Sequence, residues 1–267
     1  MDYIKQQDES ISKIFAKHQK WYKASSDVWG ERYMREKRDI LTEKRNKKEL
    51  RVILKYLPKN CKKILDAPCG YGRISNVLAS QGYDVTGIDI SKYFINIASE
   101  QSTKKDLKVL YSIGDIFKNK LPGKFDAVLN IFTSIGYLES DKKNELFIKR
   151  LCDYVAPRGR LIVETINPIA LLANYKSEDT VILKDGARIY YKRFFDVKTS
   201  TSITKIREVE QSGKSRNLVH IIRLYYPHEL INICKKFSCS LVSILDENGN
   251  KKDIKNSMRI WMIFEKK

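Results

Sequence analysis

The sequence is poor in the residues that build metal sites and disulfide frameworks. Its 267 residues include 5 cysteines and 3 histidines. The cysteines are odd in number, and none of them forms a CxxC pair of the kind that zinc ribbons and redox motifs use. We therefore expect reduced thiols and no bound metal.

Long apolar runs are missing as well. No stretch approaches the eighteen or so apolar residues that a membrane span requires. The first residues, "MDYIKQQDES", lack the basic segment and apolar core of a secretory signal. These two absences predict a cytoplasmic protein that does not enter a membrane.

Acidic residues are scarce relative to basic ones, with 32 aspartates and glutamates against 51 lysines and arginines, a formal net charge of +19. Such an excess attracts polyanions, so nucleic acid is a possible partner. Only 15 of the basic residues are arginine, the side chain best suited to phosphates and base edges. Solvated lysine faces therefore remain an alternative explanation of the charge.

The order of elements predicts an α/β fold. A helix over 31–57 precedes the strand "KKILDA", a glycine-rich turn and the helix "RISNVLASQGY". "DVTGIDI" is typical of a buried strand, and Ser91 is a suitable cap for the helix that follows. "LKVLYSIGD", "FDAVLNIFTSIGYL" and "GRLIVETIN" add further strands. Strands that alternate with helices favour a doubly wound, mostly parallel, Rossmann-like sheet.

The pattern changes after Asn167. Strand-like segments with turn signals at Asp185-Gly186 and Ser212-Gly213 predict an inserted antiparallel β-sheet, and the C-terminal segments predict a helix and an antiparallel hairpin at the sheet edge. We expect three parts: an N-terminal helical lid segment (1–57), a core (58–167 and 226–267) and the antiparallel insertion (168–225).

Three acids follow the first three predicted strands: Asp66, Asp89 and Asp115. In open parallel sheets ligands bind beyond these strand ends, so the acids should face one extended ligand. The turn has Gly70 and Gly72 but lacks the third glycine of a dinucleotide motif. An acid before the turn would repel a pyrophosphate and suits a ligand that bears an ammonium group.

The motif "LDAPCGYG" resembles the first motif of class I S-adenosylmethionine-dependent methyltransferases, and the similarity extends over 62–167. The resemblance implies S-adenosyl-L-methionine as the cofactor. It implies that Asp66, Ala67 and Gly70 hold the methionine part and that Asp89 binds the ribose. It further implies that the adenine is contacted by Ile90, Asp115 and Ile116, and that Asn130 and Ile131 lie near the sulfonium. Pro68 stands where many relatives have the first glycine of the turn.

Methyl transfer by direct displacement needs mainly alignment, and a base only if the acceptor arrives protonated. The candidates for that base are Tyr137, His220 and His228, each of which also has a purely structural explanation. In similar small-molecule enzymes an aromatic N-terminal segment covers the cofactor, which makes Trp29 and Tyr33 candidates here. The insertion would form another wall, for which the candidate contacts are Tyr190, Tyr191, Phe194 and Phe195.

The acceptor is not fixed by the sequence. "NIFTS" lacks the proline pair of exocyclic-amine nucleic-acid enzymes and the cysteine of C5-pyrimidine enzymes, whereas "YYPHEL" resembles small-molecule methyltransferases. We expect transfer to nitrogen or oxygen of a small molecule. An RNA or protein methyltransferase that uses its basic surface, and a non-catalytic cofactor-binding regulatory subunit, remain alternatives. The oligomeric state is not predicted.

Overall fold

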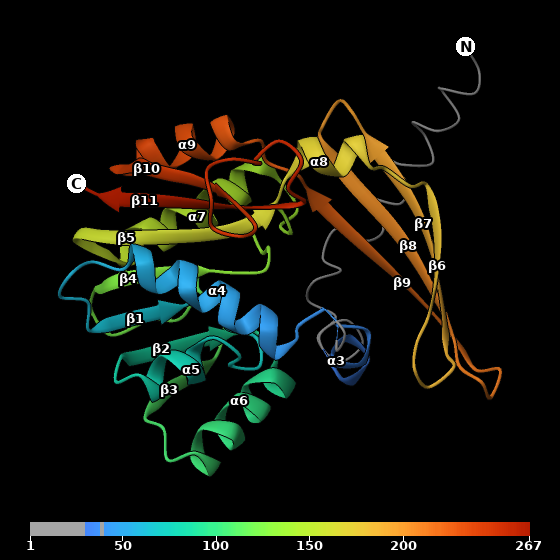
Figure 1. Ribbon diagram of the computed structural model, residues 1–267, viewed down its shortest axis with the longest axis horizontal. Helices are drawn as coiled ribbons and strands as arrows, with labels where there is room; N and C mark the ends of the chain where they lie inside the picture. The colour runs from blue at the N-terminus through green and yellow to red at the C-terminus, as the bar shows by residue number, and fades with distance from the viewer. Residues whose placement is uncertain (1–29, 38–39) are drawn as a thin grey trace.

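The computed structural model describes residues 30–37 and 40–267, and its core is a seven-stranded sheet (Figure 1). The strand order is β10-β11-β5-β4-β1-β2-β3. β1 pairs in parallel with both β2 and β4, so the strand order reverses beside β1. The strands are β1 (Lys63–Asp66), β2 (Asp84–Asp89), β3 (Val109–Ile113), β4 (Phe125–Asn130), β5 (Val155–Ile166), β10 (Cys239–Asp246) and β11 (Arg259–Lys266).

Helices cover both faces of this sheet. In β1, Ile64 packs into the cluster formed with α4 and α5, whereas Leu65 packs into the cluster formed with α7 and α9. Strands buried on both faces are nearly continuous apolar runs, which explains the "KILDA" and "RLIVE" segments. The helices are α4 (Glu43–Tyr56), α5 (Ser75–Ser80), α6 (Lys92–Lys104), α7 (Asp141–Tyr154) and α9 (Pro227–Lys236). Ser91 caps α6 as predicted, since its hydroxyl accepts a hydrogen bond from the Phe94 amide.

The C-terminal hairpin closes one side of the sheet. β11 pairs antiparallel with β5, and β10 pairs antiparallel with β11 at the edge. Trp261 and Ile263 pack on the face of α4 and α5, while Met262 and Phe264 pack on the opposite face. The predicted edge hairpin is therefore present.

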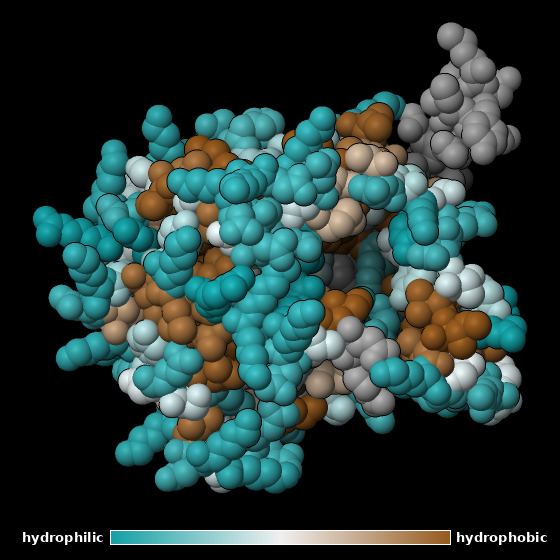
Figure 2. All heavy atoms as spheres, in the orientation of Figure 1, coloured by the Kyte–Doolittle hydropathy of each residue, from teal (hydrophilic) through white to brown (hydrophobic). Residues whose placement is uncertain are grey.

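A second sheet of four antiparallel strands stands beside the core (Figure 1). Its turns fall at the predicted positions, where Gly186 and Gly213 adopt positive φ. The short helix α8 (Pro168–Ala173), which the sequence analysis did not predict, leads into this sheet. Hydrophobic side chains gather on part of the surface of the insertion (Figure 2). The exposed apolar residues of the insertion include Val181, Ile182 and Val197. The strands are β6 (Glu178–Ile182), β7 (Arg188–Asp196), β8 (Thr201–Val209) and β9 (Ser215–Arg223).

The N-terminal part differs from the prediction of one helix over 31–57. The structure shows α3 (Glu31–Lys37) and, separately, α4, which begins after Thr42 because the Thr42 hydroxyl caps it by accepting from the Arg45 amide. α3 lies between the core and the insertion sheet (Figure 1). Its Tyr33 ring lies 5.6 Å from the Phe94 ring, and its Glu36 accepts a hydrogen bond from the Tyr191 hydroxyl at 3.1 Å.

Trp29, a candidate lid residue, lies outside the described residues. Within the described ranges, no helix combines the length and apolarity needed to cross a membrane.

Candidate functional site

A cavity of about 830 Å³ lies beyond the carboxyl ends of β1, β2 and β3. This is the position at which open parallel sheets bind ligands, beside the reversal of strand order at β1. Nine of the ten predicted cofactor residues line it: Tyr33, Asp66, Ala67, Gly70, Asp89, Ile90, Asp115, Ile116 and Ile131.

The glycine-rich turn after β1 forms the floor of the cavity. Gly70 and Gly72 have φ of 54° and 76°, a region in which side chains are unfavourable. A Cβ on Gly72 would lie 2.3 Å from the Tyr111 hydroxyl oxygen, so packing also demands glycine there. A Cβ on Gly70 would meet nothing within 4 Å, because that position faces open space. A ligand can therefore approach the backbone at Gly70.

Asp89, at the end of β2, is fixed by backbone amides. Its Oδ2 accepts from the Gly70 amide at 2.9 Å, and its Oδ1 accepts from the Ser91 amide at 2.8 Å. Burial raises the pKa of Asp89 to about 6, while the bonds from the Ser91 and Gly70 amides act in the opposite direction. One carboxylate thus joins the ends of two neighbouring strands, and its remaining lone pairs suit a pair of hydroxyl donors.

Asp66, at the end of β1, is buried deeper. Its Oδ2 accepts from the Ser75 hydroxyl at 2.6 Å. Burial raises its pKa to about 7, the Ser75 bond and the Arg73 charge lower it, and the charge of Asp89 raises it. A cation placed in the cavity would stabilise the ionised form of this carboxyl group.

Asp115 and Ile116 line another part of the cavity. The Asp115 carboxylate accepts from the Phe117 amide at 3.0 Å, which orders the loop after β3. Ile116 is buried and Asp115 is half-buried. The three predicted acids therefore border one continuous cavity, as expected from their positions after neighbouring strands.

Asn130 is the exception among the predicted cofactor residues, because it does not line the cavity. Its side chain is fully buried at the end of β4, where Nδ2 donates to the Ala67 carbonyl at 2.7 Å. Its Oδ1 has no hydrogen-bond partner among the described residues. The geometry gives Asn130 the role of a support for the turn after β1.

The structure separates the three candidates for a catalytic base. Tyr137 lines the cavity, and burial raises its pKa to about 12, so its hydroxyl is protonated near neutral pH. His220 lies on β9 opposite Thr204 and is not among the lining residues. Burial lowers the pKa of His220 to about 4, against the raising effect of Glu36. His228, the third candidate, is exposed at the start of α9.

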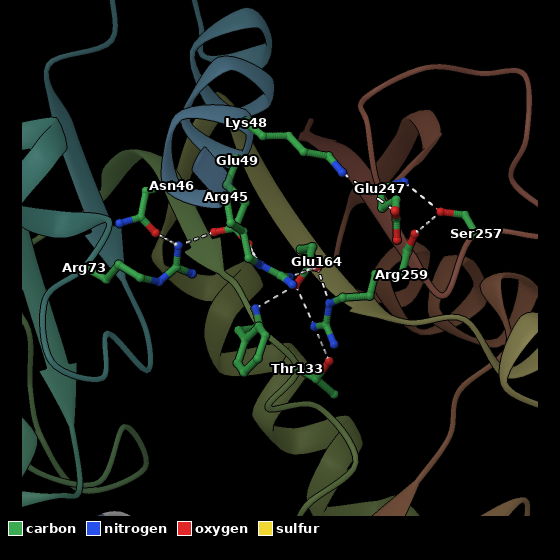
Figure 3. Close-up of polar contacts among 11 residues, drawn as sticks. Arg45, Asn46, Lys48, Glu49, Arg73, Thr133, Glu164, Glu247, Ser257 and Arg259 are labelled. Atoms are coloured by element: carbon green, nitrogen blue, oxygen red, sulfur yellow. Dashed lines mark hydrogen bonds and ion pairs between the residues drawn. The ribbon is translucent and has the colours of Figure 1, made fainter. Parts of the chain in front are cut away.

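The sequence analysis missed a buried ionic network beside the cavity (Figure 3). Glu164 on β5 lies at its centre and binds Arg259 of β11 and Arg45 of α4. Burial raises the pKa of Glu164, but the charges of Arg259 and Arg45 lower it by more, so the pKa lies below its ordinary value. No motif signals this network, because its members come from segments far apart in the chain. One signal was present in the sequence: the "VETIN" segment places a glutamate inside an apolar strand.

Comparison with known proteins agrees with this geometry. A family model described as "Methyltransferase domain" matches residues 64–159, the segment that carries β1 to β4 and all three acids. Residues 64–159 thus carry a methyltransferase domain. The family resemblance expected from "LDAPCGYG" and the fold class expected from the order of elements are confirmed.

Curated relatives match part of the chain. A ubiquinone biosynthesis O-methyltransferase of Rickettsia typhi is 36% identical over 107 residues, which is 39% of this chain and 41% of that protein. The chain therefore spans less than half the length of that relative.

Solved structures extend the likeness beyond the methyltransferase domain. An S-adenosylmethionine-dependent methyltransferase from Clostridium acetobutylicum has a TM-score of 0.74 at 18% identity, covering 88% of this chain and 96% of that one. CalS10, an amino pentose methyltransferase from Micromonospora echinaspora solved with S-adenosylmethionine bound, has a TM-score of 0.67 at 14% identity, covering 91% of this chain and 99% of that one. At these low sequence identities, the structural likeness shows a shared fold and nothing more.

Proposed function

We propose that this protein is an S-adenosyl-L-methionine-dependent methyltransferase that transfers a methyl group to nitrogen or oxygen of a small molecule. The supporting observation is the pair of buried carboxylates at adjacent strand ends, Asp66 and Asp89, which border one cavity with an open approach to Gly70. The methyltransferase-domain match to residues 64–159 agrees with it.

The residues present fit this cofactor. Asp89 would accept from the two ribose hydroxyls while it keeps its bond from the Gly70 amide, and Asp66 would face the ammonium group of the methionine part. Ile90 and Ile116 offer apolar surface to a purine, and Asp115 offers an acceptor for its amino group. A phosphate ligand fits poorly, because two buried carboxylates at the strand ends would repel it.

When bound, S-adenosylmethionine supplies a methyl carbon activated by its sulfonium. The protein must then align the acceptor and exclude water, effects that together can supply about 7–11 kcal/mol. Apolar and aromatic side chains line the cavity at Tyr33, Ile131 and Phe132, and an acceptor packed against them would be shielded from water. The protonated Tyr137 hydroxyl would orient the acceptor by hydrogen bonding rather than act as a base.

We propose lid and wall roles for the N-terminal segment (1–57) and the insertion (168–225) around the core (58–167 and 226–267). α3 supports this division, because it places Tyr33 at the cavity while Glu36 binds Tyr191 of the insertion. His220 lies on the insertion sheet, so we assign it a structural role. A cytoplasmic location remains a prediction from the sequence.

Either acceptor atom is consistent with the relatives, since the Rickettsia protein is named an O-methyltransferase and CalS10 an amino pentose methyltransferase. The test is to incubate the full chain with methyl-labelled S-adenosylmethionine and cell extract separated by molecular size. Label in metabolites, unaffected by nuclease or protease, would support the proposal. Label only in a protease-sensitive or nuclease-sensitive fraction would refute the small-molecule acceptor.

A second function, RNA methylation, is favoured by one observation, the net charge of +19. Label that disappears after ribonuclease treatment would establish it. Cofactor binding without transfer to any fraction, in a stable complex with another protein, would instead point to a regulatory subunit.

A further inference from the structure

The segment after β4 has an unusual backbone at the cavity. Phe132 and Thr133 have φ of 67° and 60°, so two consecutive non-glycine residues adopt the left-handed conformation. This conformation is unfavourable for residues with a side chain, above all for a β-branched residue such as threonine. Strained backbone persists only where its surroundings hold it in place, and it is concentrated at functional sites. Both residues line the cavity.

Glu164 binds the amides of both strained residues. Its Oε2 accepts from the Phe132 amide at 2.8 Å, and its backbone carbonyl accepts from the Thr133 amide at 3.1 Å. The side chain is 2% exposed, so the carboxylate acts in a dry environment where hydrogen bonds are strong. No other described residue binds both amides.

Two arginines complete the support (Figure 3). The guanidinium carbons of Arg45 and Arg259 lie 4.9 and 4.7 Å from the centroid of the Phe132 ring, and both arginines bind Glu164. Arg259 Nη2 also donates to the Thr133 hydroxyl at 2.6 Å. Phe132 and Thr133 are thus held through backbone, ring and hydroxyl at once.

The same network reaches the glycine-rich turn. Arg45 Nε binds Glu49 at 2.5 Å, and Glu49 in turn binds Arg73, which lines the cavity beside Gly70 and Tyr71. α4 therefore connects the segment after β4 with the segment after β1. Both segments line the same cavity.

We propose that Glu164 is a positioning residue, which holds Phe132 and Thr133 in the conformation that aligns the methyl acceptor. The assignment rests on the proposed function, since it concerns the acceptor end of the same cavity. Glu164 does not line that cavity, so it acts through Phe132, Thr133 and Arg259.

The test compares the wild-type chain with Glu164→Gln, which keeps the shape of the side chain and removes its charge. Hydrogen exchange should be at least about tenfold faster at the Phe132 amide, which the side chain binds, and unchanged at Leu129 in β4. The rate of label transfer to the small-molecule extract, measured over a dilution series of the extract, should fall roughly 10- to 100-fold. Affinity for S-adenosylhomocysteine should stay within about threefold, because none of Glu164, Phe132 and Thr133 is among the residues proposed to hold the cofactor.

Two further variants guard against misfolding and non-specific effects. Thr133→Gly relieves the left-handed strain, so it should fold well, yet it should also speed local exchange and slow transfer. Glu247→Gln is the matched control. The Glu247 amide donates to the Ser257 hydroxyl, which donates to the Arg259 carbonyl, while the Glu247 carboxylate pairs with Lys48 and not with Glu164, Phe132 or Thr133. It should leave exchange and transfer unchanged.

Unchanged exchange at the Phe132 amide in Glu164→Gln would overturn the assignment. So would faster exchange with undiminished transfer by an active enzyme, or a loss of transfer in Glu247→Gln equal to that in Glu164→Gln. A wild-type chain that transfers no label would refute the proposed function, and the exchange measurement would still decide whether Glu164 holds this segment.

Discussion

The Gly70 amide donates a hydrogen bond to Oδ2 of Asp89 at 2.9 Å, which joins the turn after β1 to the end of β2. The carboxylate therefore has two functions in the proposed site. It fixes the glycine-rich turn before a ligand arrives, and it offers its remaining lone pairs to the ribose.

Asp89→Ala should remove both functions. Charge-assisted hydrogen bonds contribute about 1.5–3 kcal/mol each, so the loss of two should weaken S-adenosylmethionine binding about 100-fold or more, as measured by equilibrium dialysis with labelled cofactor. Asp84→Asn is the matched control, because Asp84 is exposed at the opposite end of the same strand. Equal losses in the two variants would show that the effect is not specific to the site.

The raised pKa of Asp66 predicts a pH dependence of stability without cofactor. Its pKa rises from 3.8 to about 7 on folding, mainly because of burial, so the folded state binds more protons than the unfolded state between these values. The free energy of unfolding should therefore decrease as the pH rises from about 4 to 7.

Asp66→Asn should flatten this pH dependence, which denaturant unfolding at pH 5, 6, 7 and 8 can measure. Added S-adenosylmethionine should stabilise the wild-type chain more at pH 8 than at pH 5, because its ammonium group favours the ionised carboxylate. Stability of the cofactor-free chain that rises over pH 5–7 and is insensitive to Asp66→Asn would contradict the assignment.

Gly70 and Gly72 make a matched pair. Gly72→Ala places a Cβ 2.3 Å from the Tyr111 hydroxyl oxygen at a positive φ, so it should reduce the free energy of unfolding by about 1–3 kcal/mol. Gly70→Ala points into open space and should cost less stability, but its methyl group enters the cavity and should weaken cofactor binding. Thermal unfolding and dialysis should thus rank the two variants in opposite order.

Tyr137→Phe separates two roles for this side chain. A hydroxyl that orients the acceptor should lower transfer to the small-molecule extract about tenfold without introducing a new titration between pH 6 and 9. A hydroxyl that acts as base would titrate in the wild-type profile, and that titration would vanish in the variant. His220→Gln should change transfer by less than about threefold, because His220 does not line the cavity.

Local sequence signals were sufficient to predict the strands, turns and caps of the core. The apolar runs that end in Asp66 and Asp89 are buried on both faces of the sheet, and Ser91 caps the following helix, so strands, turns and caps could be read from short segments. The doubly wound, mostly parallel sheet then followed from the alternation of strands and helices. The single helix predicted for 31–57 was wrong, because the cap at Thr42 was not recognised within a run of helix-forming residues.

Tertiary contacts account for what could not be predicted. Phe132 and Thr133 adopt positive φ because Glu164, Arg45 and Arg259 hold them, and these three residues lie on three different elements. Asn130 was predicted to lie at the cofactor because it stands at the end of a strand. Its side chain instead binds the Ala67 carbonyl and does not line the cavity.

Calorimetric titration of the full chain with S-adenosylmethionine at neutral pH tests the central claim most directly. The account predicts saturable binding at one site per chain, lost in Asp89→Ala, with no comparable binding of a pyrophosphate-containing dinucleotide. Absence of heat with S-adenosylmethionine, or tighter binding of the dinucleotide, would contradict it.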